Sequence, residues 1–159
     1  MSAGGNAACV VSSCDGLAPK FAAALVATIE QCHAEGLDAV IFETTRSDAL
    51  AQVYYRRGRP PSAEFPSPVT NAPDASWTWH GYGLAADIIS ASREWNAGQS
   101  WFTEMGRIAK ANGLDWGGDW NHPDLPHVQF GTLKASPSEQ SRSLYPGHIA
   151  EVWALVGAA

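Results

Sequence analysis

Apolar segments in this chain are short, and their length constrains the fold more than any other feature of the sequence. The longest uninterrupted apolar run covers residues 21–27, far below the ~20 residues that a membrane-spanning helix needs. No single segment can therefore form a core by itself, and several segments must share one. A length of 159 residues suits one compact domain, because domains commonly have roughly 150 residues.

The spacing of apolar residues predicts helices and strands in an irregular order. Phe21, Leu25, Ile29 and Cys32 recur at the period of a helix. The apolar run at 39–42 is typical of a buried strand. We further expect helices at 48–57 and 100–111, extended segments at 84–89, 114–116 and 127–130, and helical structure within 137–156. Because strands and helices do not strictly alternate, we predict an α+β fold, with helices packed on a small antiparallel sheet.

Two segments fit no regular element. Residues 1–14 are small, polar and glycine-rich, and we expect a flexible N-terminal segment there, followed by a single domain over residues 15–159. Five prolines lie within residues 59–76, too many for a helix or a central strand, so we predict a long surface loop. Long loops in compact domains often carry functional groups.

The charge balance excludes several classes of partner. Lys and Arg number 10 against 16 Asp and Glu, and the formal net charge is −6. A nucleic-acid-binding protein needs a basic face to neutralise phosphates, and a polybasic membrane anchor needs a basic cluster. Neither pattern is present in this sequence. The first basic side chain is Lys20, so we expect no secretory signal and synthesis in the cytoplasm. A monomer is the default expectation.

Three cysteines, Cys9, Cys14 and Cys32, are an odd number for a disulfide framework. Buried or idle thiols are the interpretation that the sequence favours. Two alternatives stay open. Cys9 and Cys14 can pair in an oxidising compartment, or the thiolates can hold a metal together with His33, although the paired spacing of structural zinc sites is incomplete.

Two histidines and one aspartate form a better candidate metal site. Two imidazoles and one carboxylate are a common zinc ligand set in which water keeps the fourth position, and His80, Asp87 and His127 can provide it. Asp87 ends an apolar run, where an unpaired carboxylate is costly and a cation would offset the cost. Gly81 and Gly83 permit the turn that brings His80 back over the strand. Singly, these residues also fit ordinary capping and hydrogen-bonding roles; together they favour a metal.

Asp124 and Arg46 are candidates for catalytic roles beside that site. Pro123 and Pro126 bend the chain before His127, so the Asp124 carboxylate can lie beside the metal as a general base. A turn-forming aspartate fits the same position. Arg46 follows the strand at 39–42, where a guanidinium can hold a substrate carboxylate or stabilise an oxyanion. Taken alone, the residue is better explained as an ordinary surface arginine.

A relaxed dinucleotide-binding fingerprint, Gly81-x-Gly83-x-x-Ala86, is rejected on its context. No apolar strand precedes it, and the residues that follow have the pattern of a strand rather than a helix. A nucleotide cofactor is therefore not expected.

Three motifs in this chain occur together in one known family. Residues 78–87 resemble the motif S-x-H-x-x-G-x-A-x-D, residues 113–129 look much like G-L-x-W-G-G-D-W … D-x-P-H-x-Q, and residues 45–59 are similar to Y-R-S … L-Y-x-x-G-R. The match runs from about residue 39 to 130 in the family's order. The chain thus resembles the zinc peptidases that cut bacterial cell-wall peptides, peptidase family M15, and in particular the phage endolysin branch.

The resemblance implies a role for each candidate residue. His80, Asp87 and His127 would be the ligands of Zn²⁺, Asp124 the catalytic base, and Arg46 the group that stabilises the transition state. The implied substrate is the stem peptide of peptidoglycan.

The implied fold is the small α+β domain that these peptidases share with hedgehog signalling domains. Two positions depart from the family's pattern. Thr78 stands where the motif has Ser, which keeps a hydroxyl, and Thr45 stands where an aromatic residue usually precedes Arg46. Neither change removes a predicted ligand or the base, so activity is expected.

Three functions are compatible with these features. The first is an L-alanyl-D-glutamate endopeptidase that acts on the cell wall after release from the cytoplasm. The second is a D-Ala-D-Ala carboxypeptidase or dipeptidase on the same scaffold. The third is a zinc-stabilised cell-wall binding module without turnover, which the presence of Asp124 and Arg46 disfavours.

Overall fold

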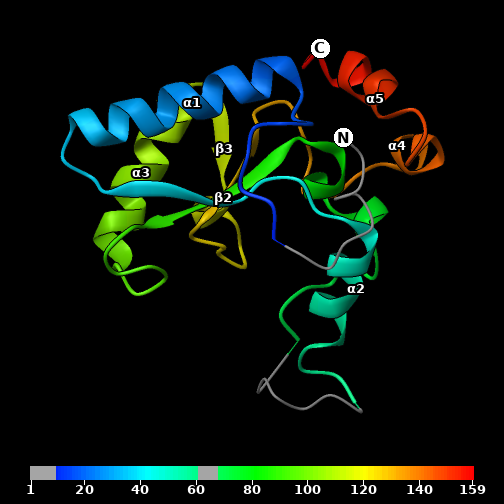
Figure 1. The fold of residues 1–159 in the computed structure, drawn as a ribbon, viewed down its shortest axis with the longest axis horizontal. Coiled ribbons are helices and arrows are strands. Elements are labelled where there is room, and N and C mark those ends of the chain that lie inside the picture. Colours follow the sequence, from blue (N-terminus) through cyan, green and yellow to red (C-terminus); the bar gives the residue numbers. More distant parts are fainter. Residues whose placement is uncertain (1–9, 61–67) are drawn as a thin grey trace.

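The centre of the fold is a four-stranded antiparallel sheet (Figure 1). The computed structural model describes residues 10–60 and 68–159. The strands are β1 (Ala39–Glu43), β2 (Ala85–Ser90), β3 (Leu114–Trp116) and β4 (His127–Phe130). Their order in the sheet is β1-β2-β4-β3, so the two central strands, β2 and β4, are separated in sequence by a helix and an edge strand.

Two long helices pack beside the sheet, and three shorter ones surround it (Figure 1). Helix α1 (Pro19–Ala34) contacts β1, β3 and α3 (Gln99–Ala111). Helix α2 (Asp48–Arg56) projects away from α1 in Figure 1. Helices α4 (Glu139–Leu144) and α5 (Ile149–Val156) complete the chain. The Lys20 N–H donates to the Ala158 carbonyl over 3.1 Å, so the C-terminal end of the chain is attached to the start of α1.

Alternation along the two central strands gives the sheet an apolar and a polar face. Ala86 and Ile88 of β2 and Val128 of β4 are fully buried, and Ala86 pairs with Val128 across the strands. Asp87 lies between these apolar positions and pairs with His127. Because successive side chains on a strand point to opposite faces, the polar residues of β2 and β4 gather on the face opposite the apolar core.

A bulge in β1 brings a third charged residue to the polar face. Ile41 pairs with Ile88, but the next pair joins Glu43 to Asp87, so β1 advances two residues where β2 advances one. An extra residue of this kind reverses the alternation of the strand that carries it. Glu43 therefore faces the same side as Asp87, although Ile41 faces the apolar side.

Helix α3 approaches β3 closely at one glycine. A Cβ on Gly106 would lie 2.2 Å from the Trp116 ring, and Trp116 is 5 % exposed. The Trp116 indole N–H also donates to the Leu125 carbonyl over 2.7 Å. Trp116 thus joins α3 to the loop that precedes β4, where the candidate base Asp124 lies.

The predicted fold class is confirmed, and the elements lie close to their predicted positions. Part of the predicted proline-rich loop, residues 61–67, lies outside the described residues. Its far end forms a short 3-10 helix, Ala75–Trp77, because the Asp74 carboxylate accepts from the Ser76 N–H. The division into residues 1–14 and 15–159 stays a prediction; Val11 and Ser13 accept hydrogen bonds from Thr44. Within the described residues, no helix is long and apolar enough to cross a membrane.

The contact at Gly106 reverses the usual effect of a Gly→Ala change in a helix. Alanine ordinarily stabilises a helix interior by about 1 kcal/mol relative to glycine. Here the new methyl group overlaps the Trp116 ring, and overpacking of this kind costs about 1–3 kcal/mol. We expect Gly106→Ala to lower the free energy of unfolding in urea denaturation. Gly147→Ala is the control, because a Cβ at that position meets nothing within 4 Å; equal effects of the two changes would contradict the packing described.

Candidate metal centre and active site

His80 is presented by a short 3-10 helix, Trp79–Tyr82, immediately before β2. The Thr78 side chain caps this helix by accepting from the His80 N–H over 3.4 Å. Gly83 ends it with φ +67°, and a Cβ at Gly83 would lie 2.3 Å from the Gly16 carbonyl oxygen. Glycine is therefore required for the turn that folds His80 back over the start of β2.

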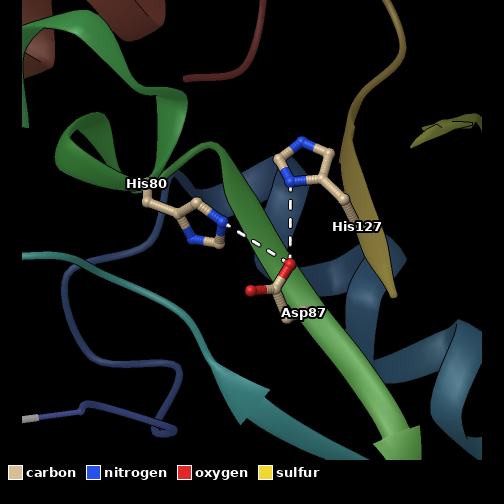
Figure 2. Close-up of side chains that lie close together, drawn as sticks. All are labelled: His80, Asp87 and His127. Carbon is tan, nitrogen blue, oxygen red and sulfur yellow. Dashed lines mark ion pairs between the residues drawn. The ribbon is translucent and has the colours of Figure 1, made fainter. Parts of the chain in front are cut away.

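His80, Asp87 and His127 converge on the polar face of the sheet (Figure 2). The Oδ1 atom of Asp87 lies 3.7 Å from His80 Nε2 and 3.6 Å from His127 Nδ1. The three potential ligand atoms all lie within 4.8 Å of one another. Tetrahedral zinc with bonds of about 2.0–2.1 Å places its ligand atoms about 3.3 Å apart, so a small contraction of this cluster suits a metal ion.

Hydrogen bonds at the far side of each imidazole determine which nitrogen faces the centre. His80 Nδ1 lies 2.8 Å from the Thr44 carbonyl oxygen, which can only accept, so Nδ1 carries the proton. His127 Nε2 lies 2.9 Å from Gln129 Oε1. The Gln129 amide nitrogen donates to the Lys134 carbonyl, so Oε1 is the acceptor for His127. Both rings therefore direct an unprotonated nitrogen at Asp87, the arrangement of metal-ligating histidines.

The electrostatics of the cluster call for a cation. Burial by itself would raise the pKa of Asp87, but the adjacent His80 and His127 imidazoles hold that pKa well below its usual range. Burial opposes protonation of His127, yet the Asp87 and Asp124 carboxylates raise the pKa of His127 overall. Asp87 is thus an anion with two imidazoles aimed at it. A proton or a metal ion must stabilise that arrangement, and the donor set of two nitrogens and one oxygen suits Zn²⁺.

Asp124 lies at the edge of this cluster. Its Oδ2 is 3.9 Å from His127 Nδ1, and half of its side-chain surface is exposed. Desolvation raises the pKa of Asp124, against an opposing effect of His127. The Asp124 N–H donates to the Gly117 carbonyl over 2.9 Å. A Cβ on Gly117 would lie 2.4 Å from the Asp124 carbonyl oxygen, so this glycine allows the loop to fold back and hold Asp124 beside His127.

Arg46 lies in the same cleft but is paired with a carboxylate. Its Nε and Nη2 donate to the two Glu43 oxygens over 2.8 and 2.7 Å, and its guanidinium lies 4.7 Å from the centre of the Tyr54 ring. Glu43 is 1 % exposed and the Arg46 side chain 9 %. Burial lowers the pKa of Arg46, but the hydrogen bonds and charge of Glu43, together with the charge of Asp87, outweigh it and raise that pKa overall. The ion pair holds a permanently charged guanidinium in one orientation.

A cleft of about 1200 Å³ contains all five predicted site residues. His80, Asp87 and His127 line it together with Asp124 and Arg46. Its walls also carry aromatic side chains, among them Phe42, Tyr54, Trp77, Trp95 and Trp120. The structure thus brings together residues that are up to 81 positions apart in the sequence. Their roles as ligands, base and transition-state group stay predictions.

Sequence reasoning missed three residues that support the site. Glu43 orients Arg46, Gln129 orients His127, and the Thr44 carbonyl orients His80. Gln129 was detectable in principle, because it lies two residues after His127 on a strand and so shares its face. Glu43 was not, because only the bulge in β1 turns it toward the site.

The cysteine alternatives receive no support from the described residues. In the parts of the chain that the structure describes, the cluster of His80, Asp87 and His127 is the one group of three suited to a metal. Cys14 and Cys32 are free thiols, and burial raises the pKa of Cys32 to about 11. Such a thiol is inert. Cys9 lies outside the described residues.

Comparison with known proteins finds similarity to cell-wall peptidases, as the three sequence motifs predict. A family profile described as D-alanyl-D-alanine carboxypeptidase, within peptidase family M15, matches residues 71–130, the segment that holds four of the five predicted site residues. The peptidoglycan L-alanyl-D-glutamate endopeptidase CwlK of Bacillus subtilis (strain 168) is 33 % identical over 108 residues. Over its central part the chain is similar to peptidases of family M15. The alignment with CwlK covers 60 % of this chain and 62 % of that M15 relative, so the chain spans less than two thirds of its length.

Solved structures of cell-wall peptidases share the fold of this chain. The Serratia marcescens L-Ala D-Glu endopeptidase ChiX aligns with a TM-score of 0.53 at 18 % identity, covering 74 % of this chain and 82 % of ChiX. The LD-carboxypeptidase LdcB aligns with a TM-score of 0.57 at 16 % identity, covering 80 % of this chain and 63 % of LdcB. At these identities the likeness establishes the fold alone.

The hydrogen bond between His127 and Gln129 predicts that a change at Gln129 alters the affinity for zinc. Loss of a residue that orients a ligating histidine typically weakens metal binding about 10–100-fold. We expect Gln129→Leu to weaken zinc binding by that factor in a competition titration with a chromophoric chelator, with the fold intact by circular dichroism. Gln140→Leu, at an exposed position of α4, should leave the affinity unchanged. Equal affinities of the Gln129 variant and the unaltered protein would contradict the proposed orientation of His127.

Proposed function

We propose that this chain is a zinc-dependent peptidase that hydrolyses the L-alanyl-D-glutamate bond in peptidoglycan stem peptides. The observation that carries the proposal is the convergence of two imidazoles and a carboxylate beside Asp124 within one cleft. The similarity to CwlK supports the choice of bond, because CwlK is named for that activity. Action at the cell wall follows from this substrate.

The metal would be held by His80 Nε2, His127 Nδ1 and Asp87 Oδ1, the three atoms that face one another. Zinc supplies Lewis acidity toward water and the peptide carbonyl when it occupies such a site. The remaining chemistry belongs to side chains of this chain.

Asp124 is placed to move protons. Its carboxylate reaches both the cluster and the solvent, because half of the side-chain surface is exposed and Oδ2 lies 3.9 Å from His127. A carboxylate there can accept a proton from the attacking water and return it to the leaving amine. The raised pKa of Asp124, which results from desolvation, makes the protonated form easier to reach during that cycle.

Arg46 is placed to stabilise negative charge. Its pairing with Glu43 uses Nε and Nη2, and among the described residues no hydrogen bond engages Nη1. The guanidinium is already oriented before substrate arrives, so no reorganisation is needed when an oxyanion develops. Glu43 acts through Arg46 as a positioning residue.

A carboxypeptidase that removes a terminal D-amino acid is the alternative, because the matching family profile carries that description and LdcB shares the fold. The two activities leave different products. Endopeptidase cleavage produces a new L-Ala carboxyl end and a new D-Glu amino end, whereas carboxypeptidase cleavage releases a single D-amino acid.

Digestion of purified peptidoglycan by the zinc-loaded protein tests the proposal, with mass spectrometry of the products. We expect L-Ala carboxyl ends and D-Glu amino ends that disappear when a chelator is added. Asp124→Asn should lower turnover at least about 100-fold, the typical contribution of a general base, without loss of bound zinc. Asp119→Asn is the matched control, since Asp119 lies in the same loop but pairs with Lys110.

Other outcomes would contradict parts of this proposal. Release of D-Ala alone would establish the carboxypeptidase instead. Bound zinc without any product would indicate a binding module. Full activity of Asp124→Asn would exclude Asp124 as the base.

A further inference from the structure

Trp95 is a large apolar side chain that the fold leaves exposed at the cleft. It follows β2 in the turn that leads to α3, and it lines the same cleft as His80, Asp87 and His127. Its exposed fraction is 45 %. Exposed indole is unfavourable in water, and its presence at the edge of a functional cleft indicates a binding surface.

The turn that carries Trp95 is held rigidly. The Asp38 carboxylate accepts from the Ser90 hydroxyl, the Ser92 hydroxyl, the Ser92 N–H and the Trp101 indole N–H, over 2.6–3.2 Å. Ser90 and Glu94 also pair with each other across the turn. The indole is therefore presented in one position before any ligand arrives, which lowers the entropy cost of binding.

Local strain and packing also fix the Trp95 ring. Glu94 has φ +53°, a conformation that L-residues seldom adopt and that persists where surrounding structure enforces it. The Phe42 ring meets Trp95 edge-on, with centroids 4.7 Å apart and an interplanar angle of 76°. Phe42 is the neighbour of Glu43, which pairs with Asp87, so this contact ties Trp95 to the polar face of the sheet.

Trp77, the other strongly exposed indole in the cleft, differs in one respect. Its exposed fraction is 41 %, but the Arg142 guanidinium lies 3.7 Å from the centre of its ring. A cation already occupies one face of Trp77, whereas no cation lies over the Trp95 ring among the described residues. Trp95 is therefore the better stacking surface.

The surroundings of Trp95 suit an amphipathic, uncharged ligand. Arg93, Glu94 and Asn96 flank it in the turn, and all three are exposed. An apolar face bordered by hydrogen-bonding groups matches a sugar ring, whose C–H face is apolar and whose edge carries hydroxyl and amide groups. A purely apolar peptide side chain would leave those polar groups without a role.

The position of Trp95 relative to the metal site agrees with the chemistry of the proposed substrate. Ser90, which pairs with Glu94, lies three residues along β2 from Asp87, roughly 10 Å at the rise of a strand. In peptidoglycan, the L-Ala residue is joined to an amino sugar through a lactyl group. L-Ala and lactyl together span about 7 Å of chain, so a sugar ring beyond them lies about as far from the cleaved bond as Ser90 lies from Asp87.

We propose that Trp95 stacks against the muramyl sugar of the substrate, so that the enzyme recognises the glycan-linked end of the stem peptide. This inference rests on the proposed function, because it takes the cleaved bond to be the one that follows L-Ala. The subsite makes the attached sugar a determinant of specificity, and a peptide without the sugar is a poorer substrate.

The test compares two substrates of the zinc-loaded full chain: N-acetylmuramyl-L-alanyl-D-glutamyl-lysine and the same tripeptide without the sugar. One stacking contact predicts a kcat/KM roughly five- to tenfold higher for the muramyl substrate. Trp95→Ala should abolish that preference while cleaving the sugar-free peptide at the original rate, which also shows that the variant folds. Trp95→Phe should retain part of the preference.

Trp77→Ala is the matched control and should keep the muramyl preference. Equal kcat/KM for the two substrates, or an equal loss on both with Trp95→Ala, would overturn the sugar subsite while leaving the peptidase intact. Cleavage of neither substrate would overturn the proposed function and the subsite with it.

Discussion

The site depends on one largely buried carboxylate, Asp87, which faces two imidazole nitrogens and needs a cation. Asp87 lies at the centre of the sheet with an imidazole nitrogen 3.6 Å away on one side and 3.7 Å away on the other. Without a proton or a metal, two lone pairs and an anion face one another at short range, an arrangement that burial makes costly. The fold bears this cost at the polar face of the sheet. Among the described residues, no other group of three potential metal ligands is gathered in this way.

Several unrelated features of the chain serve that convergence. Gly83 turns the chain so that His80 faces β2, and Gly117 lets the loop before β4 hold Asp124 beside His127. The two imidazoles are oriented by the hydrogen bonds that they donate to the Thr44 carbonyl and to Gln129 Oε1. The three proposed ligands are therefore oriented before a metal binds, and preorganisation of this kind is what a catalytic metal site requires.

Much of this arrangement could be predicted from the sequence, and the limits have physical causes. The elements followed from apolar periodicity, and His80, Asp87 and His127 from the types of residue that bind zinc. Glu43 escaped prediction because a bulge reverses the strand alternation locally, and a bulge has no reliable sequence signal. The exposed Trp95 escaped because aromatic residues are usually buried, and only the Asp38 contacts to the turn explain its position.

X-ray absorption spectroscopy at the zinc edge of the metal-loaded protein tests the central claim most directly. The account predicts one tightly bound zinc per chain, with two imidazole nitrogens and oxygen ligands at about 2.0–2.1 Å and no sulfur. His80→Ala should remove the imidazole signal together with most of the bound metal. Sulfur scattering near 2.3 Å, the distance of a zinc–thiolate bond, would instead assign the metal to the cysteines and contradict the site described.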